Sequence, residues 1–152
     1  MHHYCSDVTI SFPVNGKFTG KQAQIYNIVL KANRTVFSKL APGSNWLELH
    51  KLAERVILTG LTELGLLTGD IDEMLEKRIG FIFMPCGMGH FIGLDVHDVG
   101  GYLRHTPKRS PLPGLKSLRT ARIIEEGNII TIEPGIYFRE FLLTGQFPED
   151  FY

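Results

Sequence analysis

The sequence predicts an α/β (α+β) fold in which two long amphipathic helices cover a sheet. Two stretches, over residues 19–41 and 45–65, carry apolar residues at helical spacing. Four short runs of alternating or continuous apolar residues predict strands, at 4–12, 81–84, 127–133 and 136–138. The chain of 152 residues, with a hydrophobic content of 43% and a charged content of 21%, fits a single globular domain.

The first predicted strand, Tyr4–Phe12, has one polar face. Alternate residues of a strand point to the same side, so Asp7, Thr9 and Ser11 are expected to share that face. The strand is followed by Asn15-Gly16, a dipeptide that favours a turn. Asp7 is therefore expected on a strand that leads into the first helix.

The two long helices are bounded by residues that typically begin and end helices. Thr19 is expected to cap the first helix, and Pro42-Gly43 is expected to end it. Asn45 with Glu48 resembles a capping box at the start of the second helix, which Gly65 closes.

The next segments are shorter. Asp70 and Glu73 predict a third helix that ends near Gly80, followed by an apolar strand at Phe81–Met84. Three prolines in His105–Pro113 indicate a surface loop. Four histidines are assigned to the surface, namely His2, His3, His50 and His105.

A glycine-rich stretch around two histidines indicates a metal site. His90 and His97 are seven positions apart, so a straight strand would place them on opposite faces. Gly93 and the Gly100-Gly101 pair instead favour bends that bring both imidazoles into one site. Glu133, at the end of a predicted strand, offers a carboxylate partner. Carboxylates with one imidazole favour a hard or borderline divalent ion such as Mn²⁺ over a thiolate zinc site.

Each candidate residue also has a purely structural interpretation. A carboxylate on a strand can accept a local hydrogen bond, and a histidine in the core can have its hydrogen bonds made by neighbouring groups. A carboxylate at a turn, or an arginine, can simply face solvent. These interpretations apply to Asp7, His90, His97, Glu133 and Arg119. Cys86 fits a small inert hydrophobe, although its neighbours leave reactivity open.

A dinucleotide-binding loop is the competing interpretation of the same glycines. Gly87, Gly89 and Gly93 form a G-x-G-x-x-x-G pattern, one residue longer than the dinucleotide fingerprint. That fingerprint requires a following helix with an apolar stripe. Residues 95–101 are polar and glycine-rich instead, so the metal site is favoured.

Charge and composition exclude several classes of function. Sixteen basic residues balance sixteen acidic ones, which argues against binding to nucleic acid or to an anionic membrane. No apolar run approaches the ~18 residues of a membrane helix. The two cysteines are too few for a disulfide framework, so a reducing compartment and a cytoplasmic location are expected.

Taken together, five motifs resemble the prolidase (Xaa-Pro dipeptidase) family. They are Ser6–Thr9, Ser11–Phe18, Gly87–Gly101, Leu118–Arg122 and Thr131–Phe138. The resemblance implies part of a pita-bread (creatinase/aminopeptidase-like) fold, a curved mixed sheet covered by helices. It implies a partial metallopeptidase catalytic domain over residues 1–138, which leaves an unassigned tail at 139–152.

The resemblance also implies roles for individual residues in a two-metal site, usually occupied by Mn²⁺. Asp7 matches the aspartate that bridges both metals, and His90 matches the single histidine ligand. Glu133 matches a glutamate ligand that also transfers protons. His97 matches a histidine that steadies the substrate and the tetrahedral intermediate. Arg119 matches an active-site arginine whose planar fork suits the carboxylate of a dipeptide.

The implied reaction is hydrolysis of Xaa-Pro dipeptides by a metal-activated water, in an enzyme that is commonly a homodimer. This chain departs from the family pattern. Two of the five family ligands have no counterpart, because the first aspartate would precede Asp7 and Glu149-Asp150 lies in the wrong context to replace the last glutamate. Cys86 stands where prolidases usually have another histidine.

Three functional classes follow from this match and its departures. The chain is an impaired manganese-dependent dipeptidase, a pita-bread module that binds without catalysis, or a prolidase fragment without function.

Overall fold

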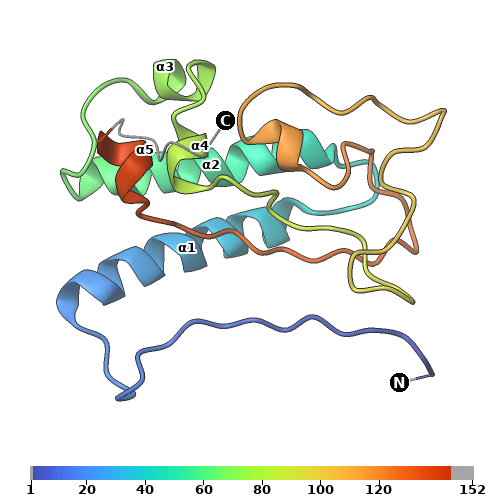
Figure 1. Cartoon of the computed structure of the whole chain (residues 1–152), viewed down its shortest axis with the longest axis horizontal. Helices are drawn as coiled ribbons and strands as arrows, with labels where there is room; N and C mark the ends of the chain where they lie inside the picture. The colour runs from blue at the N-terminus through green and yellow to red at the C-terminus, as the bar shows by residue number, and fades with distance from the viewer. Residues whose placement is uncertain (1, 145–152) are drawn as a thin grey trace.

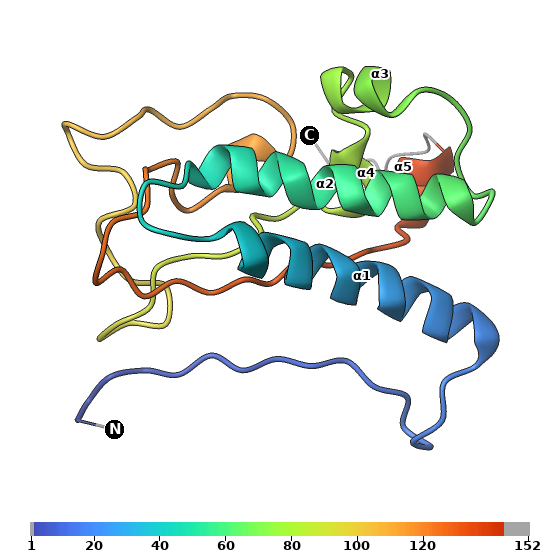
Figure 2. The same cartoon turned by 180° about the vertical axis from the view of Figure 1, so that it is seen from behind.

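The computed structural model of this chain describes residues 2–144. Two long helices, α1 and α2, lie side by side and run antiparallel, and extended segments pass alongside them (Figures 1 and 2). The elements in chain order are α1 (Gly20–Lys39), α2 (Trp46–Glu63), α3 (Ile71–Glu76), α4 (Gly80–Phe83), the 3₁₀ helix η1 (Leu115–Ser117) and α5 (Glu140–Thr144).

The first helix begins where the sequence predicts. The Thr19 hydroxyl accepts a hydrogen bond from the Gln22 N–H, and the Gln22 side chain accepts one from the Thr19 N–H. This reciprocal pair satisfies two N–H groups that the first helical turn leaves free. The preceding turn is also confirmed, because Gly16 has a positive φ of 72° and its N–H donates to the Pro13 carbonyl.

The second helix is capped as predicted but lacks the full capping box. The Asn45 side chain accepts hydrogen bonds from the N–H groups of Leu47 and Glu48. The Glu48 carboxylate pairs with Lys51 at 2.9 Å, although the capping box would direct it back to the start of the helix. Gly65 follows the helix in the left-handed region, as expected for a C-terminal stop.

The core lies mainly along the contact between the two long helices. Trp46, Ile57 and Leu61 of α2 are completely buried. At Gly60 the helices approach so closely that a Cβ atom there would lie 2.7 Å from the Ile28 side chain of α1. The apolar stripes read from the sequence therefore face each other.

The prediction of a strand at residues 81–84 is wrong. The third helix ends at Glu76, two residues before Arg78, which adopts a positive φ of 58°. The chain then forms the short helix α4, in which the Met84 N–H donates to the Gly80 carbonyl. An apolar run of four residues is too short to show a period, so the sequence does not distinguish a buried strand from a helical turn here.

The predicted sheet is also wrong for the described part of the chain. Within residues 2–144 no strand is formed, and two isolated antiparallel bridges join Asn45 to Ile123 and Phe91 to Ile130. Residues 4–12, 127–133 and 136–138 are extended or irregular, and the pairing of residues 127–133 amounts to the isolated bridge between Phe91 and Ile130. The extended N-terminal segment lies at one edge of the molecule (Figure 1).

The surface assignment of His50 is wrong, whereas His2, His3 and His105 are exposed. His50 is completely buried, with its Nε2 atom 3.4 Å from Oε1 of Glu54. It lies one helical turn after Trp46 on the buried face of α2. The spacing of the apolar residues in the sequence therefore already indicated that His50 is buried.

The range 139–152, expected to be an unassigned tail, begins with α5. The remaining residues, including Glu149 and Asp150, lie outside the described residues. No helix found in residues 2–144 combines the length and apolar character needed to cross a bilayer.

Removing the arginine partner of Glu54 is expected to destabilise the fold. The Arg78 guanidinium lies 2.6 Å from Oε1 of Glu54, whose side chain is fully buried. We expect Arg78→Met to lower the free energy of unfolding by about 3–5 kcal/mol, because a buried carboxylate loses its counterion. Urea denaturation measures this loss.

Arg55→Met is the matched control, because the Arg55–Asp72 pair is exposed. It is expected to change the free energy by less than about 1 kcal/mol. Equal losses in the two variants would contradict the importance of the buried pair.

Candidate metal centre

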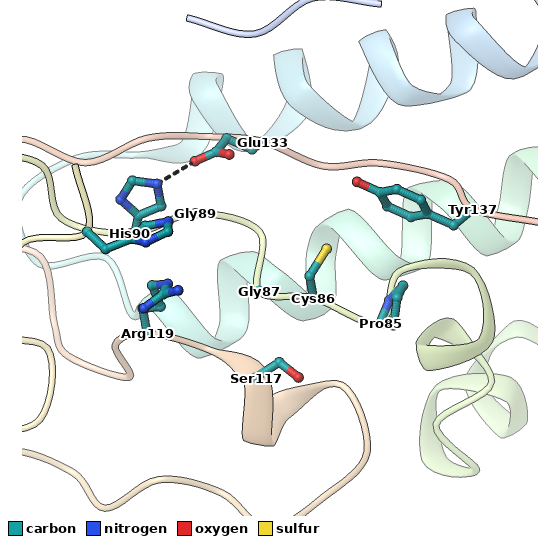
Figure 3. Close-up of a pocket in the computed structure, with 10 residues that line it drawn as sticks. Pro85, Cys86, Gly87, Gly89, His90, Ser117, Arg119, Glu133 and Tyr137 are labelled. Carbon is teal, nitrogen blue, oxygen red and sulfur yellow. Dashed lines mark ion pairs between the residues drawn. The ribbon is translucent and has the colours of Figure 1, made fainter. Parts of the chain in front are cut away.

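Three segments that are distant in the sequence bring Asp7, His90 and Glu133 together. Nε2 of His90 lies 3.0 Å from Oε1 of Glu133 and 3.3 Å from Oδ2 of Asp7. One ligand atom from each residue lies within 4.8 Å of the other two. Figure 3 shows the Glu133 carboxylate directed at the His90 ring.

The segments that carry His90 and Glu133 pair with each other in antiparallel fashion. The Glu133 N–H donates to the Met88 carbonyl at 2.6 Å, and the Thr131 N–H donates to the His90 carbonyl at 2.9 Å. The Ile92 N–H continues the series by donating to the Ile129 carbonyl at 3.2 Å. The segment 127–133, predicted as a strand, therefore finds its partner in the histidine-bearing segment.

The N-terminal segment is fixed near this pair by contacts with residues 93–94. The Cys5 N–H donates to the Gly93 carbonyl at 2.8 Å, and the Cys5 thiol contacts the Leu94 carbonyl at 3.1 Å. Two residues later, Asp7 faces His90, and the Thr9 hydroxyl lies 3.5 Å from Oδ1 of Asp7. Thr9 thus shares the polar side of the segment with Asp7, as the alternation predicts.

The two histidines meet because the chain bends between them, as the glycines predict. The His90 and His97 rings lie edge to face, with centroids 4.4 Å apart. The Asp98 N–H donates to the Phe91 carbonyl at 3.0 Å, which closes the bend. At Gly93 the absence of a side chain lets the Asp98 carboxylate approach the backbone, because a Cβ atom there would lie 2.0 Å from a carboxylate oxygen of Asp98.

The hydrogen bond of the His90 ring determines what its Nε2 atom offers. Nδ1 lies 2.9 Å from the Phe91 carbonyl oxygen, which can only accept, so Nδ1 carries the proton. In the neutral ring, Nε2 then presents a lone pair. This atom is buried and makes no hydrogen bond, and it faces two carboxylate oxygens. The repulsion between a lone pair and two anionic oxygens is relieved by a cation, either a proton on Nε2 or a metal ion, and the donor set of one imidazole and two carboxylates fits a divalent metal ion.

A pocket of about 500 Å³ opens beside His90 and Glu133 (Figure 3). His97 and Arg119 also line it, and both are exposed. Four of the five residues singled out from the sequence thus share one pocket, and the fifth, Asp7, contacts His90 from the N-terminal segment.

Cys86, which stands at the position of a family histidine, lines the pocket together with Tyr137 and Ser117, neither of which was singled out from the sequence. Cys86 is exposed at the pocket wall and is not a buried small hydrophobe. The pKa of Tyr137 is raised chiefly by the charge of the neighbouring Cys86 thiolate, and then by burial, a hydrogen bond with Cys86 and the charge of Glu133. Tyr137 follows Glu133 by an even number of residues along an extended segment, a signal that both share one side.

Substitution of Cys86 is expected to lower the pKa of Tyr137. Cys86→Ser removes the ionisable thiol but keeps a hydrogen-bonding group, whereas Cys86→Ala removes both. Because the thiolate charge is the largest cause of the shift, the serine variant should account for most of the fall towards the ordinary value of 10.0. Tyrosinate absorbance against pH measures it, and subtraction of the Tyr137→Phe titration isolates this residue. An unchanged titration in both variants would contradict the assigned cause.

Similarity to known proteins extends over nearly the whole chain. The model of metallopeptidase family M24 matches residues 1–149. The chain is 54% identical to the Xaa-Pro dipeptidase of Rattus norvegicus and 49% identical to that of Homo sapiens, in each case over 93% of this chain and 29% of the relative. It therefore spans less than a third of the length of these relatives.

Solved structures of aminopeptidases share its fold. Aminopeptidase PepP of Pseudomonas aeruginosa superposes with a TM-score of 0.76 and 41% identity, over 90% of this chain and 28% of that protein. Zinc-substituted Escherichia coli aminopeptidase P, solved with product, superposes with a TM-score of 0.75 and 40% identity, over 89% of this chain and 28% of that protein. The fold is thus a part of the aminopeptidase P architecture, and the chain belongs to metallopeptidase family M24.

Proposed function

We propose that residues 1–138 form part of the catalytic domain of an Xaa-Pro dipeptidase. In this proposal Asp7, His90 and Glu133 bind a divalent cation, and the adjoining pocket receives the dipeptide. The observation that carries the proposal is the buried Nε2 atom of His90, which lies 3.3 Å from Oδ2 of Asp7 and 3.0 Å from Oε1 of Glu133. The identity with Xaa-Pro dipeptidases supports the choice of substrate.

The donor set supports Mn²⁺ as the cation. Two carboxylates and one imidazole are hard to borderline ligands, and the one thiol of the pocket, Cys86, is absent from the group whose ligand atoms meet. When bound, such a cation lowers the pKa of a water ligand and polarises a carbonyl group. Two carboxylates neutralise the charge of one divalent ion, so we propose that this chain alone holds one cation and has low activity.

The pocket residues have distinct roles in the proposed reaction. The Glu133 side chain is 40% exposed, so one carboxylate oxygen is free to accept a proton from the attacking water and to donate it to the departing proline nitrogen. That nitrogen carries no hydrogen in the substrate, because it is the ring nitrogen of proline. His97 donates a hydrogen bond to the substrate carbonyl, and the Arg119 guanidinium pairs with the terminal carboxylate.

A binding module without catalysis is the second candidate. It is favoured by the ligand count, since within residues 2–144 the group of facing ligand atoms contains three residues and the family site has five. In this function the pocket would bind a peptide carboxylate through Arg119 without cleaving it. Hydrolysis of Gly-Pro in the presence of Mn²⁺ separates the two functions.

Manganese binding tests the proposed site. We expect Glu133→Gln to weaken Mn²⁺ binding at least about tenfold, because it removes a charged oxygen ligand and leaves the shape of the side chain. Calorimetric titration of the purified chain measures the affinity and the number of ions.

Glu126→Gln is the control, because this exposed carboxylate lies just before the segment 127–133 and outside the pocket. It should bind Mn²⁺ as the unsubstituted chain does. Equal affinity in the Glu133 and Glu126 variants would refute the assignment of Glu133 as a ligand.

A further inference from the structure

Thr131 holds both polar backbone groups of His90. Its N–H donates to the His90 carbonyl at 2.9 Å. Its hydroxyl accepts a hydrogen bond from the His90 N–H at 3.0 Å and lies 3.3 Å from the His90 carbonyl. Thr131 lies opposite His90 in the antiparallel pair. It therefore accepts the His90 N–H with its side-chain hydroxyl, where a backbone carbonyl would ordinarily be the acceptor.

A close approach at Gly89 explains why the hydroxyl is needed. In a regular antiparallel pair, the His90 N–H would donate to the Thr131 carbonyl. Here that carbonyl oxygen lies against Gly89, where a Cβ atom would be 2.1 Å away. The Thr131 hydroxyl occupies the acceptor position for His90 instead. Gly89 and Thr131 are thus a matched pair, one making room for the carbonyl and the other replacing it as acceptor.

The position of the His90 ring follows its backbone directly. Nδ1 is hydrogen-bonded to the carbonyl of the next residue, Phe91, so the ring and the backbone at 90–91 form one unit. Two residues from Thr131, the Glu133 N–H is bonded to Met88. A shift of the His90 backbone would therefore move Nε2 relative to Glu133.

We propose that Thr131 is a positioning residue of the metal centre, whose hydroxyl fixes His90 so that Nε2 meets Glu133 at 3.0 Å. This inference rests on the proposed metal site. Thr131 is only partly buried and contacts the ligand through the backbone of His90, so it acts through another residue. Its hydroxyl, and not its methyl group, is the part that matters.

Two substitutions separate the hydroxyl from the rest of the side chain. Thr131→Val keeps the β-branched shape and removes the acceptor of the His90 N–H, whereas Thr131→Ser keeps the acceptor and removes the methyl group. We expect Mn²⁺ affinity, measured by calorimetry on folded chains, to fall at least about tenfold in the valine variant and to stay within about twofold in the serine variant. Circular dichroism establishes that both variants are folded at the temperature used.

A second readout does not depend on metal binding. The Nδ1–H signal of His90 in ¹⁵N NMR, protected by its bond to Phe91, should be lost or broadened by Thr131→Val and retained in Thr131→Ser. The proposal would be overturned if the Thr131→Val variant kept both the Mn²⁺ affinity and the Nδ1–H signal of the unsubstituted chain. It would also be overturned if the Thr131→Ser variant lost them as the valine variant does. If the unsubstituted chain binds no Mn²⁺, the proposed function fails, and the NMR signal alone decides whether Thr131 positions His90.

Discussion

The antiparallel contact between residues 88–92 and 129–133 is the feature on which the site depends. It carries His90 on one segment and Glu133 on the other, and its backbone hydrogen bonds fix their spacing. Helix α1 supports the same contact from outside, since the Asn33 side chain donates to the Ile132 carbonyl at 2.8 Å. The position of two ligands, His90 and Glu133, thus depends on this short pairing and on its support by α1.

The third ligand is held differently. Asp7 lies on an extended segment whose apolar side chains face solvent, with Val8, Ile10 and Phe12 exposed at 90%, 73% and 69%. A segment of this kind presents an apolar face to solvent, which is a risk for association with other chains. The contacts of Cys5 with residues 93–94 are what bring Asp7 to His90. The centre therefore combines two ligands on paired segments, His90 and Glu133, with a third, Asp7, on a segment that has fewer contacts.

The sequence predicted the helices better than the strands, for a physical reason. A helix satisfies its hydrogen bonds locally, so Thr19 and Asn45 mark its start in the sequence itself. A strand depends on a partner elsewhere in the chain, and the pairing of 127–133 with 88–92 left no periodic signal in the glycine-rich segment. The bend that joins His90 to His97 was predictable because glycines favour bends, and Gly100 just after it has a positive φ of 92°. The clustering of Asp7 with them came from the resemblance to a family, because no local pattern links the ends of the chain.

Electron spin echo spectroscopy of the Mn²⁺-loaded chain detects nitrogen bound to the ion and therefore reports whether His90 is a ligand. We expect modulation from one imidazole nitrogen, which disappears in His90→Gln and persists in His97→Gln. Absence of imidazole modulation in the loaded chain, or its persistence in His90→Gln, would contradict a centre built on the His90 lone pair.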